Sequence, residues 1–510
     1  MKRFIIFSLL VFCASTLLAQ NVNLKKLDTY YSELVEEWDV PSMSVAIVKD
    51  GKILFQKGYG VAKEGSELSV DEHTNYAIAS NSKAMTTFVM AQLVEEGIVS
   101  WDDPVQKHLP YFKLYDEYTS AHTTVRDLLC HRVGLGTFSG DFIWYKSDLT
   151  AEEIIRRIQF VPQTSEFRTA FGYSNLMYIT AGELIKTATG KSWNENIQER
   201  VFNAVEMERS LTHINKLESK GNYATPHARS NGKNLPIQWE NWGDAVGATG
   251  GVISNVNDMA NWMIMNLENG VWKDEKLISS ASRNQLWKTH VSHGVNRMND
   301  NTFERHFNGY GLGWGLSDFY GNLMVSHTGG YDGMLSAVSL IPDENLGIVV
   351  LTNGMQSPMM AATYYTLELF TEGEASREWS ESMLARTVQN AKKDERIEAI
   401  KASKVEGTKT SIPFKRFTGT YVADMYGEIQ VTEVSGGLRL EFSRSKDLGA
   451  TLKHWHYNTF ELVWDQPHAW FTFGTIQFEL DNKLNITGAQ FDVPNNDIFF
   501  DELDVKRVGK

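Results

Sequence analysis

The sequence predicts an α+β fold: an antiparallel sheet flanked by helices with an all-helical lobe, followed by a small all-β barrel domain. Strand-like runs stand on both sides of a long, mainly helical stretch from about residue 80 to 290, which favours one sheet closed by the two ends of a domain. From residue 413 onward only short β-type runs separated by turn residues remain, as in small barrels. A length of 510 residues is enough for more than one domain.

The first twenty residues have the pattern of a secretory signal peptide. Lys2 and Arg3 precede the apolar run FIIFSLLVF, and small residues follow near Ala19. The run is shorter than the ~20 residues that cross a bilayer. We therefore expect a signal peptide over residues 1–20, a periplasmic or secreted protein, and no membrane insertion after cleavage.

The composition is that of an ordinary soluble globular protein, with 42% hydrophobic and 22% charged residues. A formal net charge of −14 argues against nucleic acid as a partner, because a phosphate-binding surface needs clustered Lys and Arg. Without the signal peptide, Cys130 is the only cysteine. We expect no internal disulfide and a buried, apolar environment for this thiol.

The main domain is expected over residues 21–390. A helix is predicted at 21–38, where apolar residues recur near helical spacing, and a β-hairpin follows around Asp50-Gly51. After the helical stretch, the runs LMVSHTGG and LSAVSLIPDENLGIVVLTN indicate strands, the latter with a turn at Pro342-Asp343, and a helix is predicted near 357–371. Sheet and central helices then form two lobes, and a cleft between lobes is a common place for an active site.

The C-terminal region has a different pattern. Residues 391–412 are charged and poor in large apolar side chains, which predicts a charged helix running into a linker. A separate β domain is expected over residues 413–510. Its strands are predicted from the runs FTGTYVAD, GEIQVTEV, GLRLEF, FELVW, AWFTFGTIQFEL and NITGAQFDV.

One predicted helix carries a serine and a lysine one turn apart. The stretch AIASNSKAMTTFVMAQLVEEG predicts a helix that is apolar along one face, begins at Ser80 and has Lys83 in its first turn. A cation there opposes the helix dipole by about 0.3–1 kcal/mol. A buried, neutral lysine can take the proton of the serine hydroxyl and make it a nucleophile. The free N–H groups of the helix end can also stabilise an oxyanion.

The Ser-x-x-Lys spacing alone is weak support for catalysis. It also occurs at Ser230/Lys233 and Ser443/Lys446, and neither pair begins an apolar helix. A helix N-cap followed by a solvated lysine explains an isolated pair equally well. The case for a catalytic site therefore depends on two further segments.

The first segment, FGYSNLMY, places Tyr173 and Asn175 at the start of another apolar helix. A phenol next to cations can relay protons, and an amide can orient a substrate. The second segment, MVSHTGGYDG, places His327 and two glycines at the end of a predicted strand. Glycines let a substrate approach a strand edge closely.

In this order the three segments resemble the motifs of the serine β-lactamase and penicillin-binding-protein superfamily: Ser-x-x-Lys, then Tyr-x-Asn, then Lys-Thr-Gly or a His-x-Gly variant. The closer likeness is to its class C-like branch of esterases, D-aminopeptidases and related exported serine hydrolases. The resemblance covers about residues 25–370 and extends to TTVRDLLCHRVGL, GATGGVISNVNDMANWM and GYGLGWGL. It implies a β-lactamase/transpeptidase-like fold and catalysis through an acyl-enzyme.

The resemblance also implies roles for single residues. Ser80 is expected to be the nucleophile, Lys83 its base partner and Tyr173 a proton relay. The backbone N–H groups of Ser80 and Gly330 are expected to form the oxyanion hole. The residues expected to contact the substrate, or in the case of the asparagine a catalytic side chain, are Asn175, His327, Thr328, Gly329 and Gly330. No metal ion or cofactor is expected.

Two departures from the family pattern stand out. His327 occupies the place where lactam-hydrolysing members usually have lysine, and a largely neutral histidine does not anchor a substrate carboxylate as lysine does. This favours substrates without a carboxylate, and it leaves His327 as a hydrogen-bond partner of either Tyr173 or the substrate. The segment RVFNAVEMERS stands where relatives usually have a Pro-Leu-Gly-Met turn; we interpret this as a local structural difference that puts no catalytic residue in doubt.

The C-terminal β region resembles the lipocalin-like domain found behind such hydrolases, including some archaeal peptidases that act on D-amino-acid peptides. The opening FTGTYV is its most recognisable piece. Two roles remain open for this domain: a stabilising appendage, or a wall of the cleft that takes part in substrate selection.

Other hydrolase classes fit the sequence less well. An α/β-hydrolase needs a Gly-x-Ser-x-Gly elbow, but in GYSNL the last position is Leu176. No His-Glu-x-x-His motif of a metallohydrolase occurs. We expect an exported serine hydrolase that acts on small esters or amides, with D-amino-acid-containing peptides among its candidate substrates. A true β-lactamase and a non-catalytic penicillin-recognising sensor remain as alternatives.

Overall fold

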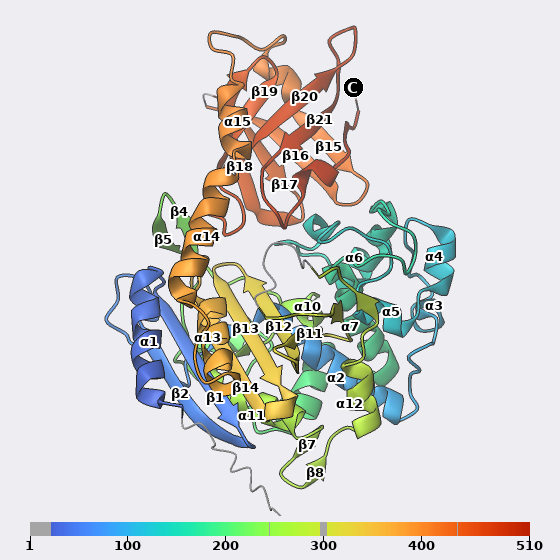
Figure 1. The fold of residues 1–510 in the computed structure, drawn as a ribbon. Helices are drawn as coiled ribbons and strands as arrows, with labels where there is room; N and C mark the ends of the chain where they lie inside the picture. Colours follow the sequence, from blue (N-terminus) through green and yellow to red (C-terminus); the bar gives the residue numbers. More distant parts are fainter. Residues whose placement is uncertain (1–21, 244, 296–302, 436, 510) are drawn as a thin grey trace, which may run out of the picture.

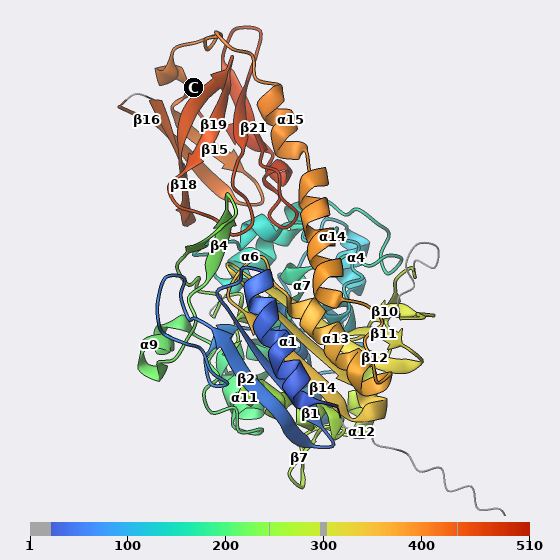
Figure 2. The same ribbon diagram turned by 60° about the vertical axis from the view of Figure 1, so that its left-hand side comes forward.

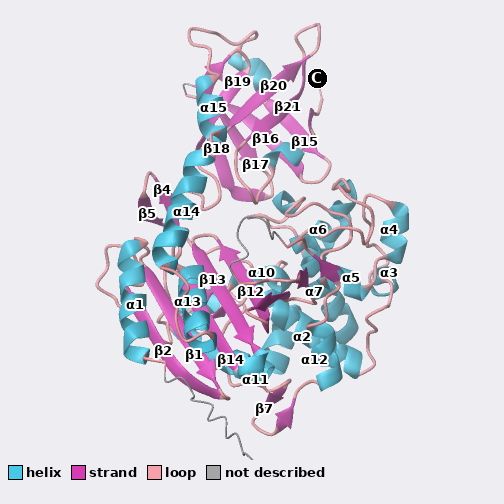
Figure 3. Ribbon diagram, viewed as in Figure 1, coloured by secondary structure: helices cyan, strands magenta, loops and turns pink. Residues whose placement is uncertain are grey.

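The computed structural model describes residues 22–243, 245–295, 303–435 and 437–509, so the predicted signal peptide lies outside the described residues. A sheet with helices on its faces, a helical lobe beside it and a C-terminal barrel make up the molecule (Figures 1 and 3). The predicted fold class is confirmed. Among the described helices, none is long and apolar enough to span a bilayer.

The main sheet is antiparallel and, within the described residues, has eight strands in the order β2-β1-β14-β13-β12-β11-β10-β9. The predicted hairpin at Asp50-Gly51 joins its first two strands, and the turn at Pro342-Asp343 joins β13 to β14. The strands are β1 Ser42–Lys49, β2 Lys52–Gly60, β9 Val291–Ser292, β10 Asn308–Tyr310, β11 Gly315–Phe319, β12 Asn322–Tyr331, β13 Met334–Ile341 and β14 Leu346–Thr352.

Both faces of the sheet are covered, so its central strands are buried on both sides. In β1, Met43 and Val45 pack toward α1 (Leu24–Glu37) and α13 (Met359–Thr371), which correspond to the two helices predicted at the ends of this region. The alternate residue Ala46 faces the other way, toward α11 (Val256–Leu267). The period-two alternation of a strand places these residues on opposite faces.

The helical lobe is built around α2 (Ser82–Glu95), which contacts helices from three later parts of the chain. Almost every residue of this helix is buried, so the expectation of a single apolar face that begins at Ser80 is wrong. A helix at the centre of a lobe is enclosed on all sides. The other helices of the chain up to residue 290 are α3 Val105–His108, α4 Glu117–His122, α5 Val125–Leu129, α6 Ala151–Arg157, α7 Asn175–Thr189, α8 Trp193–Ile197, α9 Leu217–Lys220, α10 Gly247–Gly250 and α12 Ser280–Leu286.

In the described part of the chain, three small two-stranded sheets lie within the mainly helical middle stretch or at its start. They pair β3 (Tyr76–Ala77) with β6 (Ile253–Ser254), β4 (His227–Ser230) with β5 (Lys233–Pro236), and β7 (Val271–Trp272) with β8 (Glu275–Lys276). Cys130 is fully buried, as expected.

The C-terminal region is a closed barrel that has eight strands among its described residues. The sequence runs predicted six of them and missed β18 and the short β22. Gly449 and charged residues interrupt the apolar alternation of β18, although its inward side chains, such as Leu448 and Leu452, are buried. The strands are β15 Gly419–Ala423, β16 Gly427–Val434, β17 Gly437–Phe442, β18 Ser445–His456, β19 Thr459–Trp464, β20 Thr475–Leu480, β21 Ile486–Asp492 and β22 Val505–Arg507.

Two helices connect the barrel to the rest of the chain. α14 (Trp379–Lys393) packs against α13, and α15 (Arg396–Ala402) continues upward beside the barrel (Figures 1 and 2). The barrel itself lies over one end of the sheet and the helical lobe (Figure 1). This is the end at which the predicted site residues meet.

Candidate active site

Ser80 lies in the 3-10 turn Ala79–Asn81, immediately before α2. The preceding Ala79 has a φ of 48°, a left-handed conformation that is unfavourable for alanine. The turn is fastened to β13: the Asn81 Nδ2 donates to Ser336 Oγ (2.9 Å), and that hydroxyl donates to the Ile78 carbonyl (2.7 Å). These bonds hold the turn in place, and the Ser80 side chain remains partly exposed.

Lys83 lies one turn further on and is completely buried. Its Nζ atom is 3.0 Å from Ser80 Oγ, 2.8 Å from Asn175 Oδ1 and 2.7 Å from the Thr249 carbonyl oxygen. Burial lowers the pKa of Lys83 well below its ordinary value, and the negative charge of Asp141 opposes that shift. Lys83 would oppose the dipole of α2 as a cation. Its burial favours the neutral amine, which does not oppose the dipole.

The three contacts of Lys83 fix the direction of its lone pair. A neutral amine has two N–H groups and one lone pair, and the Asn175 Oδ1 and Thr249 carbonyl oxygens can only accept. Both N–H groups are therefore used by these two atoms, and the lone pair faces Ser80 Oγ. In this state the serine hydroxyl donates to the lysine, which is the geometry of a nucleophile with its general base.

Asn175 is held entirely by protein groups at the N-terminus of α7. Its Oδ1 accepts from Lys83 and from Thr249 Oγ1 (2.6 Å), and its Nδ2 donates to Asp141 Oδ2 (2.6 Å). Asn175 therefore orients the lysine. Of the two roles open for it, the geometry favours the contact to a catalytic side chain over the contact to a substrate amide.

Asp141 is a carboxyl group that sequence reasoning missed. It is almost completely buried, accepts from Trp144 Nε1 (2.8 Å) and Asn175 Nδ2, and burial raises its pKa to about 8. Burial disfavours the charge on both Asp141 and Lys83, while the charge of each favours the charged form of the other, so the two groups titrate as a coupled pair.

Tyr173 lies close to both Ser80 and Lys83. Burial raises the pKa of its hydroxyl, and a hydrogen bond with the Ser80 side chain opposes this rise. The Lys83 Nζ atom lies 4.9 Å from the centre of the Tyr173 ring. The structure thus brings Ser80, Lys83 and Tyr173 together in one place.

His327 is engaged by the protein on both ring nitrogens. Its Nδ1 is 2.6 Å from the Thr328 carbonyl oxygen, and since that oxygen can only accept, Nδ1 carries the proton. Its Nε2 then accepts from the Tyr310 hydroxyl (2.8 Å), and burial lowers the pKa of the ring to about 3. The hydrogen-bond partner of His327 Nε2 is therefore Tyr310, and not Tyr173 or the substrate, the two partners expected from the sequence.

Near Ser80, the last residues of β12 pair with β13 along one edge and are unpaired with β11 along the other. The pairing of β11 with β12 ends at Gly315 and Ser326, whereas the pairing with β13 continues to Tyr331. A Cβ atom on Gly329 would lie 2.2 Å from the Ile78 carbonyl oxygen, so glycine is required for the close approach of the strand to the turn before Ser80. Thr328 is exposed at this edge.

A pocket of about 420 Å³ opens at Ser80. Aromatic and aliphatic side chains form most of its wall, and the barrel contributes Trp470, Asp497 and Ile498. Of the described residues that line it, Asp141 and Asp497 are acidic and none is Lys or Arg. The lining residues are Ser80, Phe138, Asp141, Trp144, Tyr173, Asn175, Trp242, His327, Thr328, Gly329, Gly330, Leu335, Met359, Trp470, Asp497 and Ile498.

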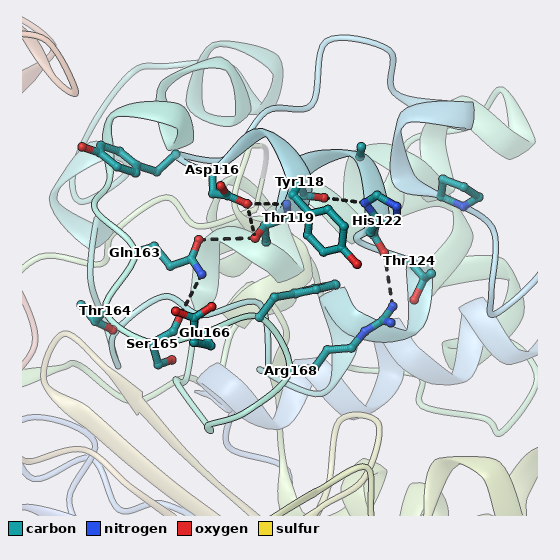
Figure 4. Close-up of a pocket in the computed structure, with 14 residues that line it drawn as sticks. Asp116, Tyr118, Thr119, His122, Thr124, Gln163, Thr164, Ser165, Glu166 and Arg168 are labelled. Carbon is teal, nitrogen blue, oxygen red and sulfur yellow. Dashed lines mark hydrogen bonds between the residues drawn. The ribbon is translucent and has the colours of Figure 1, made fainter.

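A larger pocket, of about 1190 Å³, lies elsewhere on the helical lobe (Figure 4). Its wall includes Tyr118, His122, Gln163 and Arg168, several of which bond to one another rather than point to a common centre. None of the predicted site residues is among the described residues that line it. The geometry of a nucleophile beside a base therefore belongs to the smaller pocket.

Several residues at the site were not predicted from the sequence, among them Asp141, Thr249, Tyr310 and Trp470. Thr249 and Tyr310 fall in GATGGVISNVNDMANWM and GYGLGWGL, so the resemblance of these segments was the signal that could have found them. Asp141 begins a short 3-10 turn (Asp141–Ile143) that carries no motif, and Trp470 belongs to the barrel region. Only the tertiary structure brings these two residues to the pocket.

Family comparisons cover most of the chain. The model of a family described as Beta-lactamase matches residues 27–371. A domain of unknown function, DUF3471, matches residues 403–507, the region that includes the described barrel strands.

Individual relatives are distant but extend over long parts of the chain. The chain is 27% identical to the unguisins hydrolase ungD' of Aspergillus campestris over 428 residues, which is 79% of this chain and 78% of the relative. It is 25% identical to Protein flp of Staphylococcus aureus over 335 residues, 65% of this chain and 64% of that protein.

Two solved structures have the same fold over nearly the whole length. The octameric penicillin-binding protein homologue from Pyrococcus abyssi superimposes with a TM-score of 0.62 at 22% identity and covers 92% of this chain and 98% of its own. SurE superimposes with a TM-score of 0.56 at 18% identity, over 95% of this chain and 98% of its own.

Proposed function

The chain belongs to the Beta-lactamase family, whose members are typically serine hydrolases, and on this premise we propose that it is an exported serine hydrolase that forms a covalent acyl-enzyme on Ser80. Its substrates are small esters or amides, with D-amino-acid-containing peptides as the leading peptide class. A relative that is named as a hydrolase supports the hydrolytic activity.

The arrangement around Lys83 carries the proposal. Its two N–H groups bind carbonyl oxygens, and its lone pair faces the Ser80 hydroxyl at 3.0 Å. In the first step Lys83 takes the hydroxyl proton while Ser80 Oγ bonds to the substrate carbonyl carbon. The bond from that carbon to the ester oxygen or amide nitrogen then breaks, and the proton passes to this leaving group, with Tyr173 as the relay. In the second step water attacks the acyl-enzyme and releases the acid and the free serine.

The charges of the pocket favour substrates without a carboxylate near the reacting bond. Asp141 and Asp497 line it, and His327 is held neutral between Tyr310 and Thr328. The Asp497 carboxyl is half-buried, and burial raises its pKa to about 6, so it carries a negative charge for most molecules at neutral pH. Such a pocket attracts an acyl group with a protonated amine, tolerates a neutral one and repels a penicillin carboxylate.

A comparison of three substrates with two serine variants tests the proposal. The substrates are a p-nitrophenyl ester, a D-alanyl anilide and a chromogenic cephalosporin, and the variants are Ser80→Ala and Ser230→Ala. Ser230 also stands three residues before a lysine, but it lies in the β4–β5 hairpin, so Ser230→Ala is the matched control. We expect turnover of the ester or the anilide to be lost in Ser80→Ala and kept in Ser230→Ala.

The same assay separates the alternatives. Fast turnover of the cephalosporin, with little of the other two substrates, would identify a β-lactamase instead. A penicillin adduct on Ser80 that persists in a mass spectrum after a chase would identify a sensor. Full activity of Ser80→Ala on whichever substrate is turned over would show that the site assignment is wrong.

Export is the remaining part of the proposal. The charged and apolar pattern of residues 1–20 supports it. N-terminal sequencing of the protein purified from the periplasm or the medium is expected to begin near residue 20 or 21. An uncleaved chain in the cytoplasm would contradict export without affecting the hydrolase assignment.

A further inference from the structure

A turn of the catalytic domain is inserted into the mouth of the barrel. The ring of Phe142 is fully buried, with its centre 4.8 Å from that of Phe500 and 5.2 Å from those of Tyr426 and Phe442, all three in the barrel. Just after it, the Tyr145 carbonyl accepts from Ser445 Oγ (3.2 Å). Residues 138–145 form this turn, which is packed between the active-site pocket and the barrel.

Glu502 of the barrel holds the beginning of this turn. Its carboxyl accepts from the Ser139 hydroxyl through one oxygen and from the Gly140 backbone N–H through the other, at 2.7 Å. The two bonds span about 360 positions of sequence, and both join the barrel to the residues directly before Asp141. A carboxyl group is suited to this place because it can accept from two donors at once.

The turn needs support from outside because its own backbone conformation is unfavourable. Phe138 has a φ of 62° and Gly140 a φ of 78°. A left-handed residue other than glycine costs free energy and persists only where its surroundings impose it. Gly140 is also enclosed, since a Cβ there would lie 2.7 Å from Val161 and 2.8 Å from Leu176. The bonds to Glu502 are therefore part of what keeps the turn in this shape.

Residues of this turn contact the backbone of Tyr173 and, through Asn175, the side chain of Lys83. The Phe138 N–H donates to the Tyr173 carbonyl (2.8 Å), and Asp141 accepts from Asn175, which in turn accepts from Lys83. A continuous path of contacts therefore runs from the barrel through the turn to the amine beside Ser80.

We propose that Glu502 is a positioning residue for the catalytic lysine: by holding Ser139 and Gly140 it fixes Asp141, and through Asn175 it fixes Lys83. The barrel then takes part in catalysis through this carboxylate as well as through the pocket wall. The inference rests on the proposed function, because it assumes that Lys83 is the base of Ser80.

The charged groups near this path determine the expected pH response. Asp141 faces Lys83 and Asp497, and Glu502 has Asp501 as its charged neighbour. Loss of the Glu502 bonds admits water to Asp141, which favours its ionised form. An ionised Asp141 stabilises the protonated form of Lys83, so deprotonation of the base requires a higher pH.

The rate at which a fluorophosphonate probe labels Ser80, measured from acidic to alkaline pH on the full chain, tests the proposal. For Glu502→Ala we expect labelling at neutral pH to be slower by roughly 10- to 100-fold, the usual cost of a misplaced catalytic group, and the inflection of the rate curve to move to higher pH. Glu502→Gln keeps one acceptor oxygen and is expected to show a smaller shift in the same direction. The Asp141→Asn background is expected to abolish the pH shift.

Arg444→Ala is the matched control. Arg444 pairs with Asp148 and Glu153 across the same two domains but does not touch the turn, so this variant is expected to keep the wild-type pH curve. An unshifted curve in both Glu502 variants, or the same slow rate and curve in Arg444→Ala, would overturn the proposal. If circular dichroism shows that Glu502→Ala does not fold, the pH curve of Glu502→Gln decides. Equal labelling of Ser80→Ala and wild type would instead refute the proposed function.

Discussion

Lys83 is surrounded by oxygen atoms, yet none of the three that it contacts carries a full charge. The hydroxyl of Ser80, the amide of Asn175 and the carbonyl of Thr249 are all neutral groups. The acidic group that acts on the lysine is Asp141, which reaches it through Asn175. The protonation of the lysine therefore depends on a carboxyl that does not touch it.

Asp141→Asn is expected to move the acid limb of the rate–pH curve to lower pH. The negative charge of Asp141 raises the pKa of Lys83 against the effect of burial. Removal of that charge lowers the pKa of the lysine further, so the neutral base persists to lower pH. The measurement is the second-order rate of Ser80 labelling against pH.

The control for this variant is Asp148→Asn, an exposed acid seven residues further along the chain that pairs with Arg444. It is expected to leave the curve in place. A shift of the Asp141→Asn curve to higher pH, or no shift, would show that the carboxyl does not act on the lysine.

At the scale of residues, sequence reasoning found the groups that belong to motifs and missed those that depend on tertiary contacts. The order of three motifs pointed to Ser80, Lys83, Tyr173 and Asn175, which the structure places within one site. Asp141 lies 34 residues before Asn175, at the start of a short 3-10 turn that contacts the barrel. No local pattern encodes such a contact.

At the scale of elements, periodicity predicted the strands and outer helices well and the central helix poorly. α2 is buried nearly all round, and its polar members have partners inside the lobe: Thr86 donates to the Ala248 carbonyl and Thr87 to the Lys83 carbonyl. The sequence alone does not distinguish a threonine whose hydroxyl is hydrogen-bonded inside the protein from one that faces solvent. β18 was missed for the same reason, since polar residues on its outer face and a glycine interrupt the apolar alternation.

Gly329→Ala in β12 is expected to impair catalysis through the backbone. A methyl group at this position would collide with the Ile78 carbonyl at 2.2 Å and with Ser336 Oγ at 2.4 Å, which moves the strand away from the turn that carries Ser80. If this misplaces the expected oxyanion donor at Gly330, the rate falls by about 10²–10³-fold. The measurement is kcat on the substrate that the wild type turns over.

Gly330→Ala is the matched comparison on the same strand. Its added methyl meets the end of the Trp470 side chain at 2.9 Å rather than the backbone of the serine turn. A side chain can shift where a backbone cannot, so the loss of kcat is expected to be smaller. A larger loss in Gly330→Ala than in Gly329→Ala would contradict the close approach of β12 to the serine turn as the cause.

At the scale of the whole molecule, the two domains share part of one core. Phe142 belongs to the catalytic domain by sequence and to the aromatic cluster of the barrel by contact. Residues of both domains accordingly fall in one continuous hydrophobic cluster. A shared core couples the unfolding of the parts that share it.

Phe142→Ala is expected to uncouple the domains. Truncation of a buried phenylalanine costs about 3–5 kcal/mol, and here the cost falls on the contact between the two units. The wild type is expected to unfold in one calorimetric transition, and the variant in two. Phe478→Ala, which removes the same ring inside the barrel beside Phe417 and Tyr421, is expected to lower the transition temperature without splitting it. A single, unshifted transition in Phe142→Ala would contradict this coupling.

The bond between Ser139 and Glu502 joins positions 363 residues apart. A ribosome that adds about 5–20 residues per second makes the second partner roughly 20–70 s after the first. During that interval the nascent chain already contains its serine, lysine and tyrosine but lacks the carboxylate that supports the turn. If Glu502 positions the catalytic lysine as proposed, the nascent chain is expected to gain its full reactivity only after the last barrel strands have been translated and have folded.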